Sequence, residues 1–141
     1  MTHEPDTNTR LAHLLQSPDP VPMTHTVEEV FGFPSQMPLP GFAPGHPLVP
    51  EKSTRFVWSP SLAKDFIEWL SDPHPEPLWI SGPTGCGKTE SLKNLFAGLH
   101  IPTVIVSAKK STEPDDILGR VQLVNGNTVL TPGPLLLAYA K

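Results

Sequence analysis

The eight residues from Gly82 to Thr89 constrain this chain more than any other part of its sequence. They read Gly-Pro-Thr-Gly-Cys-Gly-Lys-Thr and match the pattern G-x-x-x-x-G-K-[ST] at every fixed position. Glycines allow backbone conformations that turn successive N–H groups toward one centre, where they can surround the oxygens of a phosphate. The sequence therefore predicts a phosphate-binding loop that opens a helix.

Two side chains of this loop have expected roles toward a nucleotide. Lys88 is the predicted catalytic residue, because its ammonium group can reach the β- and γ-phosphates of ATP. Thr89 is the predicted metal ligand, because its hydroxyl can bind the Mg²⁺ that accompanies ATP. Cys86 stands where the backbone does the binding, so we interpret it as a tolerated small residue and not as a nucleophile.

The residues around the loop place it between a predicted strand and a predicted helix. Residues 77–81 are a short apolar run between breakers and predict a buried strand. Residues 88–100 predict a helix with one apolar face, which Gly98 and the following proline end. Residues 103–108 are β-branched and apolar, which predicts a second strand. Strand, helix and strand in this order predict a right-handed βαβ unit and a parallel sheet.

A further helix is expected over residues 59–72. Ser59 suits the N-cap position, and Pro60 suits the first helical position. The apolar residues recur at helical spacing and form one face, which we expect to pack in the core: Leu62, Phe66, Trp69 and Leu70, with Ala63 and Ile67 beside them.

The last third of the chain predicts a hairpin followed by a helix. Asn125-Gly126, at the centre of residues 121–130, is the favoured two-residue turn of a β-hairpin. A connecting hairpin and a substrate-engaging loop both fit this segment, and the sequence favours the former. A helix begins near Pro134 and reaches Lys141 without a stop signal, so we expect the sequence to be truncated there.

The N-terminal part is rich in proline, which the chain contains 19 times. Residues 1–25 are expected to be a disordered tail in which residues 11–15 can form a helical turn, and residues 26–34 form a compact apolar element. Residues 35–50 carry frequent prolines and fit either a polyproline ligand for a partner or an extended segment laid over the domain. The second interpretation is favoured, with anchors at Leu39, Phe42 and Leu48.

Composition and charge exclude several classes of protein. The net charge of −4 comes without a basic stripe, which argues against a nucleic-acid partner, and no apolar stretch is long enough for a membrane span. The single Cys86 allows no intrachain disulfide, so a reducing, cytoplasmic setting is expected. The six histidines lack metal-ligand spacing, and Lys109-Lys110 fit a solvated loop.

ATP hydrolysis requires a second element that the sequence does not show. P-loop ATPases carry an acidic residue at the end of a later strand, where it helps to hold Mg²⁺. After Thr89 no apolar strand ends in Asp or Glu, and Asp115 and Asp116 are interpreted instead as a helix-start pair. We therefore expect ATPase activity of a full-length parent, whereas the activity of this chain stays open.

Beyond the loop, residues 77–141 resemble the AAA+ ATPases of the MoxR and chelatase branch. The resemblance lies in "SGPTGCGKTESL", "IPTVIVSA", "DDILGR", the hairpin and "TPGPLLLAYAK". The stretch "TVEEVFGFPSQMPLPGF", followed by "HPLVP", is similar to the leader of CobS-type proteins, the AAA+ subunit of aerobic cobaltochelatase.

The resemblance implies an α/β fold, a P-loop NTPase core with an incomplete parallel sheet, a β-hairpin insertion and an extended proline-rich arm. It divides the chain into a tail (1–25), a leader that we call the N-terminal arm (26–58) and a partial AAA+ core (59–141). It carries over as cofactor-binding positions Gly82, Gly85, Gly87, Lys88 and Thr89, with Pro83, Thr84, Cys86 and Glu90 as loop neighbours.

The resemblance also implies a ring-forming ATPase, hexameric in its full-length form, that uses ATP hydrolysis to remodel a partner. In the cobaltochelatase case the partner carries an integrin-like metal-binding domain, and the hairpin at 121–130 would face the interior of the ring. Two other functions share the loop. One is an interaction module that binds ATP without hydrolysing it. The other is a small-molecule kinase, which would need an arginine-rich lid, and only Arg120 follows the loop.

Overall fold

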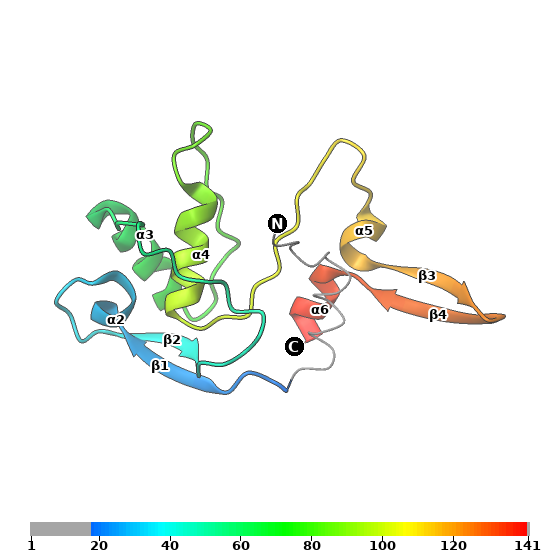
Figure 1. The fold of residues 1–141 in the computed structure, drawn as a ribbon, viewed down its shortest axis with the longest axis horizontal. Helices are drawn as coiled ribbons and strands as arrows, with labels where there is room; N and C mark the ends of the chain where they lie inside the picture. The colour runs from blue at the N-terminus through cyan, green and yellow to red at the C-terminus, as the bar shows by residue number, and fades with distance from the viewer. Residues whose placement is uncertain (1–17, 141) are drawn as a thin grey trace. The chain divides into compact units, whose positions relative to one another are not determined.

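The computed structural model describes residues 18–140, which belong to two compact units that are described separately. One unit spans Pro20–Thr103 and contains the glycine-rich loop, and the other contains the chain from Val104 onward. Figure 1 labels the helices and strands of both units. The helical turn expected at residues 11–15, and most of the expected tail, lie outside the described residues.

The first unit opens with a two-stranded antiparallel sheet. Strand β1 (Pro22–Thr26) pairs with β2 (Pro38–Phe42), with His25 opposite Leu39. The two prolines of β2 are tolerated because this strand has only one partner, so its other edge needs no N–H donors. The expected tail to residue 25 is therefore wrong for residues 22–25, which pair with β2.

Helix α2 (Val27–Phe31) links the two strands and is held by a capping box. The side chain of Thr26 accepts a hydrogen bond from Glu29 N–H at 3.2 Å, and Glu29 Oε2 accepts one from Thr26 N–H at 3.1 Å. These two bonds satisfy donors that the first turn of a helix cannot satisfy by itself. The helix ends at Gly32, which adopts φ +77°. The spelling T-x-x-E could have predicted this start from the sequence.

Replacing Thr26 by alanine is expected to destabilise the first unit by about 1 kcal/mol, because the first turn of α2 loses its side-chain acceptor. Chemical denaturation followed by tryptophan fluorescence would measure the change. Thr24→Ala is the matched control, since Thr24 is exposed on the neighbouring strand. Equal stabilities of the Thr26→Ala variant and the wild-type chain would contradict this account of the capping box.

Helix α3 (Pro60–Ser71) confirms the predicted helix and its cap. Ser59 Oγ accepts a hydrogen bond from Leu62 N–H at 3.3 Å, and Pro60 occupies the first turn. Ala63 and Phe66 are buried, so the predicted face packs in the core.

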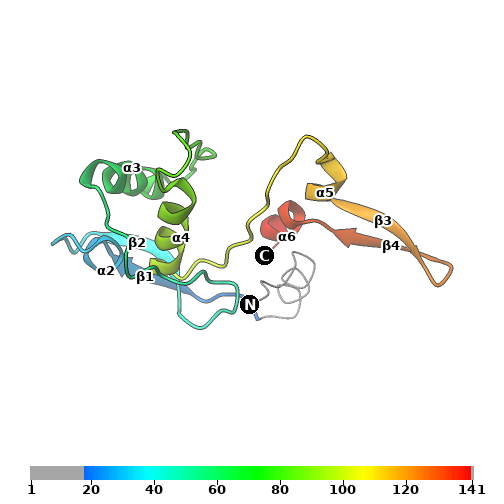
Figure 2. The ribbon, with the colours of Figure 1, turned by 45° about the horizontal axis from the view of Figure 1, so that its top comes forward.

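Helix α4 (Lys88–Gly98) completes this core. Leu95 and Leu99 are both fully buried, as the predicted apolar face requires. Both α3 and α4 lie on one side of the β1–β2 sheet (Figures 1 and 2). The buried cluster draws on the N-terminal arm and both helices: it contains Val27, Val30, Phe31, Leu39, Ala63, Phe66, Leu95 and Leu99.

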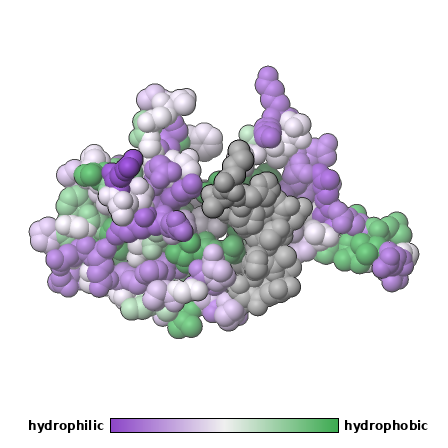
Figure 3. All heavy atoms as spheres, in the orientation of Figure 1, coloured by the Kyte–Doolittle hydropathy of each residue, from purple (hydrophilic) through white to green (hydrophobic). Residues whose placement is uncertain are grey.

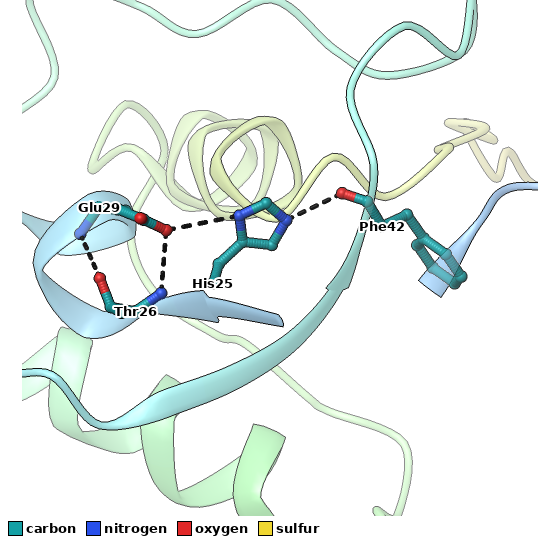
Figure 4. A network of polar contacts seen from close by, with 4 residues as sticks. All are labelled: His25, Thr26, Glu29 and Phe42. Atoms are coloured by element: carbon teal, nitrogen blue, oxygen red, sulfur yellow. Dashed lines mark hydrogen bonds and ion pairs between the residues drawn. The ribbon is translucent and has the colours of Figure 1, made fainter. Parts of the chain in front are cut away.

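His25 and Phe42 connect the β1–β2 sheet to the C-terminal end of α4 through hydrogen bonds. Its side chain is buried, Nε2 donates a hydrogen bond to the carbonyl of Phe42 at 2.8 Å, and Nδ1 lies 3.6 Å from Glu29 Oε2 (Figure 4). Phe42 N–H in turn donates to the carbonyl of Leu99 at 2.9 Å. Gly41 permits this close approach, since a Cβ there would lie 2.5 Å from that carbonyl oxygen.

The residues between β2 and α3, which we call the connecting segment (43–58), run along the same unit. Leu48 is half-buried, and its carbonyl accepts a hydrogen bond from Thr103 N–H at 3.0 Å. Leu39, on β2, is 1% exposed. The proline-rich residues therefore contact their own domain, as in the favoured interpretation of residues 35–50.

The predicted parallel sheet is absent from residues 18–140, where both sheets are two-stranded and antiparallel. Residues 77–81 and 103–108 form neither helix nor strand, and the βαβ prediction is wrong for this structure. Parallel strands are normally buried on both faces by neighbouring elements. Here Trp79 is 90% exposed and Val106 is 42% exposed, so both segments lack that cover.

The second unit confirms the predicted hairpin. Strands β3 (Gly119–Val124) and β4 (Asn127–Pro132) pair in antiparallel fashion around the turn at Asn125-Gly126. Helix α5 (Pro114–Leu118) precedes the hairpin, and α6 (Pro134–Ala140) follows it.

One face of the hairpin is apolar and exposed. Val121 and Leu130 are opposite each other and are 67% and 60% exposed, and Leu123 on the same face is 79% exposed. Figure 3 shows these apolar residues in green, with hydrophilic residues at the tip.

None of the helices formed by residues 18–140 has the length and apolar character needed to cross a membrane.

Candidate nucleotide-binding site

The glycine-rich loop lies at the N-terminal end of α4 (Figure 1). Gly85 and Gly87 adopt left-handed backbone conformations, with φ of +82° and +86°, which residues with a Cβ rarely adopt. Gly87 is the N-cap of α4 and has no side chain with which to cap it. The N–H groups of the first turn are therefore left for an external acceptor, and the positive end of the helix dipole favours an anion.

Lys88 is folded over this loop. Its Nζ donates hydrogen bonds to the carbonyls of Gly82 and Pro83 at 2.7 and 2.8 Å, and lies 3.8 Å from Cys86 Sγ. The ammonium group is thus already at the loop, bound to neutral acceptors. Because phosphate oxygens carry negative charge, they would attract the ammonium group more strongly than these neutral carbonyls do.

The other predicted contacts lie beside Lys88 and are open to solvent. Thr89 is exposed in the first turn of α4, which leaves its hydroxyl accessible. The Glu90 carboxylate lies 3.9 Å from Lys93 Nζ on the outer surface of the helix. Cys86 is exposed and packs close to Gly82, where a Cβ would lie 3.1 Å from Sγ. The loop thus presents backbone and cationic groups outward.

The residues present fit a magnesium–nucleotide complex in part. Mg²⁺ in such sites is held by one or two protein oxygens together with phosphate oxygens and water. Thr89 offers one hydroxyl at the correct end of α4. Within residues 18–140 there is no group of three His, Cys, Asp or Glu side chains placed to hold a metal ion.

The acidic residues after the loop serve a helix start, as the sequence predicted. Asp115 and Asp116 lie in the first turn of α5, and Asp116 Oδ2 accepts a hydrogen bond from Glu113 N–H at 2.9 Å. Asp116 also pairs with Arg120. The hydrogen bond from Glu113 and the positive charge of Arg120 lower the pKa of Asp116, because both stabilise the ionised carboxylate. Asp116 is therefore engaged in capping α5.

Two residues near the loop were not found from the sequence. Asn94 is buried within α4, where its amide contacts the connecting segment, and Phe56 lies beside Gly87. A signal for Asn94 was available, because it is polar at a position adjoining the apolar face of a helix, and Ser91 is another buried polar residue on α4. Phe56 had no such signal, since its contact with the loop depends on the path of the chain.

Comparisons with known proteins agree with the pattern of the loop. Residues 77–140 match the family model of the AAA domain (dynein-related subfamily). Protein NorQ of Paracoccus denitrificans is 40% identical over 65 residues, which are 46% of this chain and 24% of that protein. The denitrification regulatory protein NirQ of Stutzerimonas stutzeri is 34% identical over 68 residues, which are 48% of this chain and 25% of that protein.

These matches show what the C-terminal part of the chain is similar to. Residues 77–140 are similar to the AAA domain of the dynein-related subfamily and to part of NorQ and NirQ. The chain spans about a quarter of the length of the curated relatives that it matches. No solved structure matches the chain. The matched span coincides with the residues on which the expected resemblance to the MoxR branch rests, whereas the residues that suggested a CobS-type protein precede it.

Proposed function

We propose that this chain is the nucleotide-binding part of a ring-forming AAA+ ATPase, and that residues 82–89 hold the phosphates of ATP. The observation that carries this proposal is the arrangement of the loop at the N-terminus of α4. Gly87 leaves the first-turn N–H groups uncapped by a side chain, and Lys88 already lies over the loop. Both features suit a polyanion and have no evident use in an empty turn.

In this proposal each group of the site has a distinct task. Backbone N–H groups of the loop and of the first turn of α4 bind phosphate oxygens, and Lys88 exchanges the carbonyls of Gly82 and Pro83 for the β- and γ-phosphates. Thr89 would hold the Mg²⁺ delivered with ATP. When bound, that ion would neutralise charge on the phosphates.

The proposal for the whole protein extends further. It would assemble as a hexameric ring in the cytoplasm, hydrolyse ATP and remodel a partner. The arm sequence "TVEEVFGFPSQMPLPGF" supports a CobS-type protein, whose partner carries an integrin-like metal-binding domain. The exposed apolar face of the β3–β4 hairpin suits an element that engages another protein.

A second candidate function is an ATP-binding interaction module without its own hydrolysis. The observation that favours it is the use of Asp116, which caps α5 and pairs with Arg120. A carboxylate with these partners is not free to serve as the acidic Mg²⁺ ligand of an ATPase. The two candidates share nucleotide binding and differ in turnover.

Calorimetric titration of the purified chain with MgATP and with AMP tests the shared step. We expect MgATP to bind at least about tenfold more tightly, because AMP lacks the β- and γ-phosphates that Lys88 is proposed to bind. Equal affinities would contradict a phosphate-centred site. Phosphate release by the full-length parent then separates the two candidates: turnover supports an ATPase, and stable binding without turnover supports the module.

A further inference from the structure

Asn94 joins helix α4 to the connecting segment. Its Oδ1 accepts a hydrogen bond from Ser53 N–H at 2.9 Å, and its Nδ2 donates to the carbonyl of Glu90 at 2.8 Å. Asn94 is 1% exposed, so water is not available to replace either partner. A buried amide is costly to leave unpaired, and the two bonds therefore fix both the side chain of Asn94 and the position of Ser53.

Three residues after Ser53, the connecting segment reaches the glycine-rich loop. A Cβ placed on Gly87 would lie 4.0 Å from Phe56 Cε2, so the Phe56 ring lies beside Gly87 with room for little more than a methyl group between them. The Phe56 ring packs edge-on against Trp58, with ring centroids 4.9 Å apart. Trp58 in turn contacts Phe31, with centroids 4.7 Å apart. Phe56 is thus backed by the core on one side and faces Gly87 on the other.

We propose that Asn94 is a positioning residue for the phosphate-binding loop. By holding Ser53 on α4 it seats Phe56 against Gly87, and Phe56 then restricts the backbone of the residue that caps α4. Gly87 has φ +86° and no Cβ, so its conformation is otherwise free to change. This inference rests on the proposed function, because its consequence is the affinity of the loop for ATP.

Trypsin and MgATP titration provide two independent readouts on the full chain. Lys52 and Arg55 are exposed on either side of Ser53 and are natural trypsin sites. In the absence of nucleotide, Asn94→Ala is expected to accelerate cleavage at both sites, because the segment is released from α4. Its affinity for MgATP is expected to fall about fivefold, the usual scale for one lost hydrogen bond.

Phe56→Ala tests the second step without touching Asn94. We expect a similar loss of MgATP affinity while cleavage after Lys52 stays slow. The double variant is expected to lose no more affinity than either single variant, since both changes remove one pathway of support. Val57→Ala is the matched control, because Val57 is 86% exposed and follows Phe56 directly. Circular dichroism of each variant confirms that α4 is intact.

The outcomes separate this inference from the proposed function. Three results would overturn the role of Asn94 alone. The first is additive losses of affinity from Asn94→Ala and Phe56→Ala, and the second is unchanged affinity in either variant. The third is unchanged trypsin cleavage in Asn94→Ala. Failure of the wild-type chain to bind MgATP would overturn the proposed function and this inference with it. Lys88→Ala is expected to bind MgATP about 10- to 100-fold more weakly while its trypsin cleavage pattern stays that of the wild type.

Discussion

Replacing Lys88 by alanine is expected to lower the affinity of the chain for MgATP by about 10- to 100-fold. The ammonium group donates to the carbonyls of Gly82 and Pro83, which places it at the loop before any nucleotide is present. Hydrogen bonds to charged groups contribute about 1.5–3 kcal/mol, and the phosphates would lose both the bonds and the positive charge. Isothermal titration calorimetry at fixed ionic strength would measure the change.

Lys93→Ala is the matched control for this experiment. Lys93 lies on the same helix and carries the same charge, but its Nζ is 3.9 Å from the Glu90 carboxylate and it does not contact the loop carbonyls. Its loss removes one positive charge from α4 without removing a proposed phosphate ligand. If both variants lost affinity equally, a general electrostatic effect would explain the result and the role of Lys88 would be wrong.

The Lys88→Ala variant also bears on stability. The lysine bonds to two carbonyls and the Cys86 thiol of an exposed loop, so we expect little change in the free energy of unfolding without nucleotide. The Lys88→Ala variant is therefore expected to lose affinity for MgATP without losing stability. This is the behaviour expected of a side chain whose main partner is a ligand.

Local sequence signals predicted helices α3 and α4 and the hairpin, because each depends on residues close together in the chain. Ser59 and Pro60 mark the start of α3, and the bond from Leu62 N–H to Ser59 Oγ is the contact that this spelling predicts. Asn125-Gly126 likewise forms the turn between β3 and β4. Caps and two-residue turns are decided within a few residues, so tertiary context has little chance to override them.

Strand predictions depended instead on partners that the sequence does not specify. The apolar runs at 77–81 and 103–108 satisfy every local criterion for a buried strand, yet in this structure they remain unpaired and partly exposed. Residues 22–25 were expected to belong to a disordered tail, yet they pair with β2. A strand exists only where another strand accepts its hydrogen bonds, and apolar character alone does not supply one.

The residues of the candidate site likewise include some that the sequence predicted and some that it did not. Gly85, Gly87 and Lys88 were predicted from the motif, because a motif records which residues a phosphate needs. Asn94 and Phe56 were not predicted, because their contacts join α4 and the loop to a segment about 40 residues earlier in the chain, as in the bond from Ser53 N–H to Asn94 Oδ1 with a separation of 41 residues. Residues that position a binding site are thus harder to predict from the sequence than residues that contact the ligand.

Replacing Leu39 by alanine is expected to destabilise the first unit by about 2–5 kcal/mol. Leu39 lies on β2 within the proline-rich residues, is 1% exposed and belongs to the buried cluster with Val30 and Phe66. Removal of a buried leucine loses its transfer free energy and leaves a cavity, which surrounding side chains fill only in part. Chemical denaturation followed by tryptophan fluorescence would measure the loss, because Trp58 packs edge-on against Phe66 in the same core.

Met37→Ala provides the contrast that distinguishes the two interpretations of the proline-rich residues. Met37 lies two residues before Leu39 but is 42% exposed, so its loss is expected to cost less than about 1 kcal/mol. If these residues served only as a polyproline ligand for a partner, neither substitution would affect the stability of the isolated chain. A large effect at Leu39 together with a small effect at Met37 requires that the segment is part of the core. In that case the arm that supports Gly87 through Phe56 folds together with the helix that carries the loop.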